Sequence, residues 1–351
     1  MDLYLAYFCT GIMLAKSFDG LNYISKLTLK RIWNMVEILG SYYLSKITKK
    51  NHHRGMPVSI SIEPTTSCNL RCPQCPSGLR EFSRPTGMLT METYTAAIDQ
   101  LGDRLTYLTL YFQGEPYLNK SFLDMVGYAS AKKIYTATST NAHYLDDENC
   151  KRTIESGLDR LVISIDGVTE ETYKKYRIGG NLDKVMEGTR NLVAWKKRMK
   201  SRKPYIIWQF IVFGHNEHEI EEVKKIAKET GVDHLAMKSA QVYDFETGSD
   251  LIPKNPKYAR YSFKNLKISI KNKLLNHCWR MWQGCVITWD GKVVPCCFDK
   301  DATYRLGELS DKTFTEIWQG QAYTSFRKLL LKSRKNIEIC KNCTEGTKVW
   351  V

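Results

Sequence analysis

The sequence predicts an α/β fold: a partial (β/α)6 TIM-like barrel with a small C-terminal cysteine-rich α+β domain and an N-terminal helical extension. From residue 57 to about 245, strand-like and helix-like patterns alternate in units of about 35 residues, which is typical of parallel strands with right-handed crossovers. The stretch before this region has a helical pattern, and the stretch after it gathers cysteines. We expect an extension over 1–54, a barrel over 55–245, a linker over 246–276 and an auxiliary domain over 277–351.

Composition and charge narrow the classes of protein. Hydrophobic residues make up 43% of the 351 residues and charged residues 25%, which excludes a disordered, collagen-like or multi-span membrane chain. The 52 Lys and Arg outnumber the 37 Asp and Glu, for a formal charge of +15. This balance favours an anionic partner: a phosphorylated substrate, an acidic membrane surface or nucleic acid. Individual basic stretches, such as 196–198 and Lys332, Arg334 and Lys335, are expected to be solvated faces.

The N-terminus bears on the redox compartment. Residues 1–15 are apolar, but the early charge is Asp2 where a secretory signal needs basic residues. The run is also shorter than the roughly 20 apolar residues that cross a bilayer. We therefore expect a cytoplasmic protein with reduced thiols, in which clustered cysteines point to metal or redox chemistry.

Residues 28–50 predict a basic amphipathic helix. Such a helix packs its apolar side on the body of the protein, which is the reading we expect, or lies on an anionic membrane surface, which stays open. The apolar positions are Ile32, Trp33, Val36, Leu39, Tyr43, Leu44 and Ile47, and the basic flanks are Lys26, Lys30, Arg31, Lys46, Lys49 and Lys50.

The barrel elements follow in order. Strands are expected at 58–62, 105–112, 134–138, 161–165, 205–213 and 234–238, with helices at 91–101, 122–131, 182–199 and 220–230, the last of these ended by Gly231. The carboxyl ends of parallel strands meet at one rim, so we expect the active-site residues there.

The C-terminal part begins with a Pro- and Lys-containing stretch, 248–276, that reads as a linker. A hairpin is expected over 286–296, because Asp290-Gly291 is a strong two-residue turn signal. A helix follows, with Phe314, Ile317, Trp318, Phe326, Leu329 and Leu330 as its apolar side.

Three cysteines, Cys68, Cys72 and Cys75, follow the first strand in a C-x3-C-x2-C pattern. Three thiolates can hold three irons of a 4Fe–4S cluster and leave the fourth iron open to a substrate or cofactor. The alternative is a Cys3His zinc site that uses His52 or His53.

This segment resembles the cluster loop of radical S-adenosylmethionine (radical SAM) enzymes, and the resemblance extends over 57–240. Glu63-Pro64-Thr65 precedes the cysteines in the usual way. Gln113-Gly114-Glu115-Pro116 resembles the family's Gly-Gly-Glu-Pro motif, with Gln113 in place of the first Gly. The resemblance implies that SAM binds at the cluster and is cleaved reductively to a 5′-deoxyadenosyl radical, with flavodoxin or ferredoxin as the one-electron donor. The implied SAM-binding residues are Gln113, Gly114, Glu115, Pro116, Ser139, Asn141, Ser164, Asp166 and Arg177.

A second group of cysteines resembles the SPASM/twitch appendage of this family. Cys278, Cys296, Cys340 and Cys343 fit its pattern best and imply one fully ligated auxiliary 4Fe–4S cluster, with a structural zinc as the alternative. Cys297 competes with Cys296, because neighbours in a strand point to opposite faces. Cys285 and Cys297 are also candidate hydrogen-atom donors, whereas Cys9 and Cys150 are expected to be ordinary thiols.

A fully ligated auxiliary cluster suits electron transfer. We therefore expect oxidation or epimerisation at a carbinol carbon of a sugar, cyclitol or related anionic metabolite, phosphorylated or lipid-linked. Maturation of a ribosomally made peptide is the alternative, and a non-catalytic cluster-bearing scaffold that binds RNA is a third reading. No nucleic acid partner is expected, because no aromatic platform for single strands is recognisable.

Overall fold

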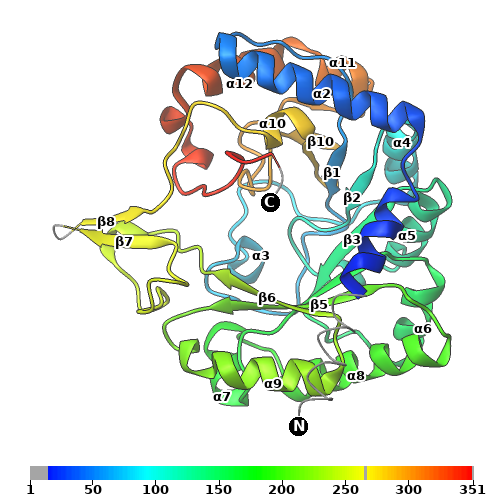
Figure 1. Ribbon diagram of the computed structural model, residues 1–351, viewed down its shortest axis with the longest axis vertical. Coiled ribbons are helices and arrows are strands. Elements are labelled where there is room, and N and C mark those ends of the chain that lie inside the picture. Colours follow the sequence, from blue (N-terminus) through cyan, green and yellow to red (C-terminus); the bar gives the residue numbers. More distant parts are fainter. Residues whose placement is uncertain (1–14, 265–266, 350–351) are drawn as a thin grey trace.

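The computed structural model describes residues 15–264 and 267–349 (Figure 1). The expectations for residues 1–14, including Cys9, fall outside the described residues. Nine strands form one sheet in the order β11-β10-β9-β1-β2-β3-β4-β5-β6, and β7 and β8 form a separate pair. In Figure 1 the six parallel strands curve around an interior, with helices along the outside.

The predicted partial barrel is confirmed. Its strands pair in parallel with their sequence neighbours from β1 to β6, as repeated right-handed βα units require. Their bounds are β1 Ser59–Ile62, β2 Tyr107–Thr109, β3 Tyr135–Thr140, β4 Arg160–Ser164, β5 Tyr205–Val212 and β6 His234–Ser239.

The covering helices agree in large part with the sequence pattern. Three of them have the predicted bounds: α4 Met91–Leu101, α5 Phe122–Ala131 and α9 Ile220–Thr230, which Gly231 ends in a left-handed conformation. The helix predicted at 182–199 is α8 Leu182–Arg198. Three short helices have too few apolar residues for the pattern to reveal: α3 Pro76–Leu79, α6 Asp147–Glu155 and α7 Glu170–Tyr176. The 3₁₀ turns are Pro116–Leu118, Glu217–Glu219, Phe245–Thr247, Arg334–Asn336 and Glu338–Cys340.

The C-terminal hairpin belongs to the barrel sheet. β9 Val286–Ile287 and β10 Lys292–Val294 form the predicted antiparallel hairpin, and β11 Gly307–Glu308 extends it. β9 also pairs in parallel with β1, with Ser61 opposite Val286. The auxiliary domain is therefore a continuation of the sheet past β1, a connection that the sequence pattern did not reveal.

The rest of the C-terminal region differs from expectation in two places. The predicted helix is broken at Gly320 into α11 Phe314–Trp318 and α12 Gln321–Ser333, and Leu329 is exposed instead of lying on the apolar side. The predicted linker 246–276 is structured, with a hairpin of β7 Tyr261–Lys264 and β8 Lys267–Ile270 that encloses its own apolar cluster. The short helix α10 Arg280–Gln283 precedes β9.

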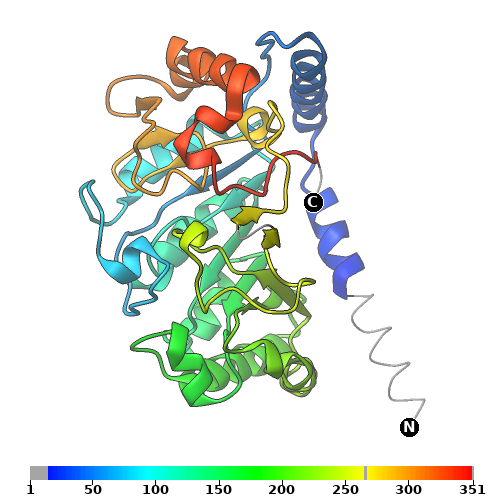
Figure 2. The same cartoon turned by 90° about the vertical axis from the view of Figure 1, so that its left-hand side faces the viewer.

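The N-terminal extension forms the predicted helix, α2 Leu29–Thr48, capped by the Thr28 hydroxyl, which accepts from the Arg31 N–H. The expectation that its apolar stripe packs on the body is wrong. Most of the stripe faces outward, although Leu39 is partly buried against the core, and the largely polar side of α2 is buried. The helix lies along the edge of the molecule (Figures 1 and 2). The buried residues are Arg31, Asn34, Ile38, Ser41, Tyr42 and Ser45.

A substitution at Gly284 tests the joint between the barrel and the auxiliary domain, which is the pairing of β1 with β9. A Cβ at this position would lie 1.7 Å from the Ser59 carbonyl oxygen, so Gly284→Ala must push β9 away from β1. We expect a loss of about 1–3 kcal/mol in the free energy of unfolding, measured by urea titration of anaerobically prepared protein. Gly127→Ala in α5 is the matched control, because its Cβ meets nothing closer than 4.0 Å and should be neutral or slightly stabilising. Equal unfolding midpoints for Gly284→Ala and wild type would contradict this account of the joint.

Candidate active site

Residues 68–75, here called the cysteine loop, follow the end of β1. Their three cysteines, Cys68, Cys72 and Cys75, lie close together. With Leu70 and Phe213 they belong to one apolar cluster. Burial raises the pKa of Cys68 to about 11, and the charges of Cys72 and Cys75 add to the shift. The three thiols therefore lie close enough to interact, after the first strand, where the sequence pattern put them.

The donor set fits a 4Fe–4S cluster better than a single ion. Within 15–264 and 267–349, no three His, Cys, Asp or Glu side chains are arranged to hold one metal ion. A cluster has a different requirement, because each thiolate binds a separate iron. In the part of the chain that the structure describes, neither histidine of the zinc alternative is grouped with these cysteines. The His53 ring packs against Trp318 instead, 5.1 Å between centroids.

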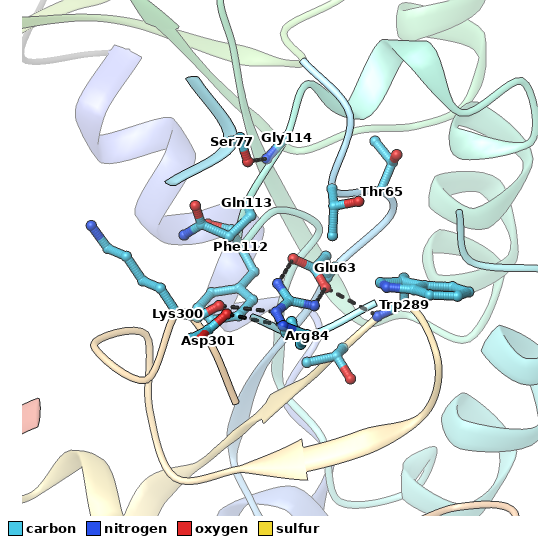
Figure 3. Close-up of polar contacts among 12 residues, drawn as sticks. Glu63, Thr65, Ser77, Arg84, Phe112, Gln113, Gly114, Trp289, Lys300 and Asp301 are labelled. Atoms are coloured by element: carbon cyan, nitrogen blue, oxygen red, sulfur yellow. Dashed lines mark hydrogen bonds and ion pairs between the residues drawn. The ribbon is translucent and has the colours of Figure 1, made fainter. Parts of the chain in front are cut away.

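Gly114 brings the end of β2 against the cysteine loop. Its φ is +73°, and a Cβ would lie 2.3 Å from the Thr65 carbonyl oxygen, so only glycine fits. Its N–H donates to the Ser77 hydroxyl at 2.9 Å (Figure 3). Gln113, which replaces a family glycine, is accommodated because its amide folds back to donate to the Phe112 carbonyl at 2.9 Å.

Glu115 is buried next to the end of β3. Its carboxylate accepts from the Thr140 hydroxyl and from the Asn141 N–H, both at 2.7 Å. Burial raises its pKa to about 7. The Asn141 amide in turn donates to Asn69 at 2.7 Å and lies 3.9 Å from the Cys68 sulfur. Glu115 and Asn141, from neighbouring strand ends, therefore contact each other, and Asn141 also contacts the cysteine loop.

Asp166 and Arg177 form a buried ion pair. The Arg177 Nε donates to Asp166 Oδ2 at 2.6 Å, and the other carboxylate oxygen accepts from the Ile211 N–H at 2.8 Å. Both oxygens of Asp166 are thus engaged within the protein. The pair directs Arg177 Nη1 to within 3.8 Å of the Cys72 sulfur. Of the remaining predicted residues, Ser139 and Ser164 lie near the ends of β3 and β4, and Pro116 begins the 3₁₀ turn after Glu115.

A second buried ion pair, which sequence reasoning missed, ties the cysteine loop to the auxiliary domain (Figure 3). Arg84 donates to both oxygens of Glu63, at 2.6 and 2.8 Å, and Glu63 also accepts from the Trp289 N–H at 3.2 Å. Arg84 Nε reaches the Lys300 carbonyl at 3.0 Å, and Asp301 accepts from the Ser83 N–H at 2.9 Å. The contacts between this segment and the auxiliary domain join residues more than 200 positions apart, so no local pattern could reveal them.

A buried arginine lies among the auxiliary cysteines. Arg334 donates to the Cys343 sulfur at 3.2 Å and to the Glu345 carbonyl at 2.7 Å. Burial alone would lower its pKa, but the charges of Cys278, Cys343 and Cys340 raise it. The expectation of a solvated face at Arg334 is therefore wrong, since its side chain is only 1% exposed.

The adjacent cysteines, Cys296 and Cys297, face different surroundings. Burial raises the pKa of Cys296, and the charges of Cys297, Cys278 and Cys343 add to the shift. Cys297 packs against the cluster of Phe112, Val286 and Val294, and its charge acts on Tyr111 and Arg280. Cys296 therefore has two of the other auxiliary cysteines among its electrostatic neighbours.

Cys285 and Cys150 belong to the packed interior. Cys285 lies near Tyr323 and Arg327, and burial raises its pKa to about 12. Cys150 is buried, as expected of an ordinary thiol.

Charged groups from both domains meet at the junction of β6 and the auxiliary domain. Lys238 lies near the end of β6, where surrounding protein lowers its pKa although water still reaches the side chain. Its ammonium is within electrostatic reach of Cys297 and of Arg280, whose guanidinium pairs with Glu345 at 2.6 Å. The charge of Glu345 acts on Lys238 as well, so the junction presents two cations, one carboxylate and one thiol.

Two family models match the chain. The model of the radical SAM superfamily matches residues 62–230, and the model of the SPASM iron–sulfur cluster-binding domain matches residues 278–344. The chain belongs to the radical SAM superfamily and carries a C-terminal SPASM domain. It is a radical SAM enzyme that uses a 4Fe–4S cluster, SAM and auxiliary SPASM iron–sulfur chemistry.

Curated relatives span several chemistries. The tungsten-containing aldehyde ferredoxin oxidoreductase cofactor-modifying protein of Pyrococcus furiosus is 26% identical over 296 residues, 76% of this chain and 82% of that protein. A PqqA peptide cyclase of Gluconobacter oxydans is 28% identical over 189 residues, 53% and 50% of the two chains. An S-adenosyl-L-methionine-dependent 2-deoxy-scyllo-inosamine dehydrogenase of Niallia circulans is 20% identical over 289 residues, 81% and 91% of the two chains.

A solved structure supports the fold. The crystal structure of BtrN in complex with AdoMet and 2-DOIA superposes with a TM-score of 0.53 at 19% identity, over 84% of this chain and 95% of that one. At this level of identity the likeness establishes the architecture, a partial barrel with a small C-terminal domain.

The position of Arg334 predicts an electrostatic effect on the auxiliary cluster. Replacing it in Arg334→Gln removes a buried positive charge beside Cys343, which disfavours the more negative reduced state. We expect a lower midpoint potential in a redox titration followed by electron paramagnetic resonance, in a Cys72→Ala background that isolates the auxiliary signal. Lys335→Gln, an exposed neighbour, should leave the potential unchanged. The same potential in Arg334→Gln and Lys335→Gln would refute the assignment.

Proposed function

We propose that this enzyme oxidises, or epimerises, a carbinol carbon of an anionic sugar, cyclitol or related metabolite. The observation that carries the proposal is the junction of Lys238, Arg280 and Cys297, which lies between the SAM-binding barrel and the auxiliary cysteines. Lys238, beside the Arg280–Glu345 pair, supplies positive charge that suits a phosphorylated or otherwise anionic substrate. The similarity, over 81% of this chain, to a dehydrogenase whose name specifies a cyclitol substrate, 2-deoxy-scyllo-inosamine, supports the same chemical class.

The reaction balances with the cofactors of the family. When bound, SAM and its cluster supply a 5′-deoxyadenosyl radical, and the auxiliary cluster accepts an electron. In oxidation, the substrate carbon gives up a hydrogen atom, the hydroxyl gives up a proton, and one electron leaves, so that a ketone forms. In epimerisation, Cys297 would donate a hydrogen atom to the opposite face, and one electron from the donor protein through the auxiliary cluster, with one proton, would restore its thiol.

The side chains around the cysteine loop have distinct proposed tasks. Glu115, Asn141, Gly114 and the neighbouring strand ends hold SAM against the loop, and Asp166 positions Arg177 beside Cys72. Burial of these groups excludes water from the place where a reactive radical must survive. The ligands of the auxiliary cluster are Cys278, Cys296, Cys340 and Cys343.

An acidic redox protein such as flavodoxin or ferredoxin is the proposed electron donor. The chain's formal charge of +15 complements such a partner and favours rapid association.

Peptide maturation is the second candidate function. The similarity to PqqA peptide cyclase supports it, but it spans only 53% of this chain. The RNA-binding scaffold has less support, because the residues implied in SAM binding are assembled around the cysteine loop.

A deuterium-transfer assay tests the substrate class. Under anaerobic conditions with a strong reductant, we expect label from the carbinol carbon of a phosphorylated sugar or cyclitol to reach 5′-deoxyadenosine, measured by mass spectrometry. Lys238→Met should still cleave SAM but lose about tenfold or more in label transfer, because one charged contact to the substrate is missing.

Lys254→Met, an exposed lysine away from β6, is the control and should transfer label like wild type. Label transfer from a precursor peptide, with none from any carbinol substrate, would favour peptide maturation instead.

Measuring the iron content of cysteine variants shows how much iron each of the two cluster sites binds. Two 4Fe–4S clusters predict about eight irons per wild-type chain and about four each in Cys72→Ala and Cys343→Ala. Only the first variant should lose reductive SAM cleavage completely. Zinc in Cys72→Ala, in place of the remaining iron, would show that the auxiliary site is structural.

A further inference from the structure

The outward face of α2 is an apolar stripe that runs the length of the helix. Leu29 is 85% exposed, Trp33 66% and Ile47 78%. The spacing of three and four residues keeps these side chains on one side through all 20 residues of α2. We call these residues the α2 stripe: Leu29, Ile32, Trp33, Val36, Tyr43, Leu44 and Ile47.

The opposite face fixes the helix in this orientation. Arg31 is buried and donates to the carbonyls of Gly102 and Lys132 at 3.1 and 3.0 Å. Asn34 exchanges two hydrogen bonds with the backbone of Met56, at 2.7 and 2.8 Å, and the Ser45 hydroxyl donates to the His52 carbonyl at 2.8 Å. Turning the stripe inward would leave these polar groups unsatisfied, so the stripe is held toward the surroundings of the molecule.

The charges around the stripe indicate its partner. Lys30, near the start of α2, and Lys49 and Lys50, just after its end, are exposed. Lys46 lies over the Tyr43 ring, 5.9 Å from its centroid. Glu37 is the single acidic residue in α2. An exposed apolar stripe flanked by lysines, with Trp and Tyr among its members, is the composition of a helix that lies in a membrane interface.

The flanking lysines argue against a second copy as the partner. Two α2 stripes packed face to face would bring lysines of one copy close to lysines of the other at both ends. Anionic headgroups neutralise the same lysines. No helix in 15–264 or 267–349 is long and apolar enough to cross a bilayer, so contact through the described helices is along the surface.

We propose that the α2 stripe docks the enzyme on an anionic phospholipid surface, with the helix parallel to the membrane plane. Leu21 and Ile24, just before α2, are exposed as well. This docking does not depend on which substrate the enzyme uses.

Vesicle co-sedimentation of the holoenzyme tests the proposal. We expect binding to vesicles of phosphatidylcholine mixed with phosphatidylglycerol, weakened by salt, and much less binding to phosphatidylcholine alone. Trp33→Gln combined with Ile47→Gln should reduce binding at least about tenfold, because both side chains are exposed and apolar.

Phe263→Gln is the matched control, because Phe263 is also 65% exposed but lies in β7, away from the stripe. It should bind like wild type, and all variants should retain SAM cleavage, which shows that they fold.

Three outcomes would overturn the proposal. The first is equal binding of wild type to neutral and anionic vesicles. The second is a wild-type dimer in analytical ultracentrifugation that the double variant converts to monomer, without vesicle binding. The third is vesicle binding by a chain lacking residues 1–14 but not by the full chain, which would assign the stripe to that segment.

Discussion

The parallel pairing of β9 with β1 is the constraint on which the two halves of the site depend. The cysteine loop follows β1, and β9 is the first strand of the hairpin that leads to Cys296, so one ladder sets the distance between these two groups of cysteines. Gly284 permits the approach because its missing side chain leaves room for the Ser59 carbonyl. The Glu63–Arg84 pair stabilises the same joint, because Glu63 also accepts a hydrogen bond from the Trp289 N–H. An electron relay between domains needs such a fixed separation.

Sequence periodicity predicted the parts of the fold that are built from local information. The helices α4, α5 and α9 have the predicted bounds because each has an apolar face and a clear end, such as Gly231 after α9. The rim residues were equally predictable, because polar side chains after parallel strands must gather there. The β9–β1 ladder and the contacts of the Glu63–Arg84 pair with Trp289 and Lys300 join segments more than 200 residues apart and leave no mark on the local pattern.

The α2 helix shows where the hydrophobic pattern is ambiguous. Periodicity establishes that one side is apolar, but it cannot say which side meets the protein. In α2 the polar side packs against the protein, because Arg31 and Asn34 donate to carbonyls that would otherwise be buried without partners. The same reasoning explains Arg334, which looks like a surface residue in a basic segment but is buried beside three thiols. In both cases a buried polar requirement outweighs the hydrophobic pattern.

Each cysteine group has a buried arginine close to one sulfur: Arg177 beside Cys72 and Arg334 beside Cys343. Burial raises the pKa of both thiols, which favours the protonated form, whereas iron binds the thiolate. A guanidinium opposes this effect, because it stays charged at any physiological pH and favours the thiolate. Both arginines are held in place by fixed acceptors, Asp166 for Arg177 and the Glu345 carbonyl for Arg334. At both groups of cysteines, burial that disfavours the thiolate is therefore opposed by a guanidinium beside one sulfur, although the local structures that hold the two arginines are unrelated.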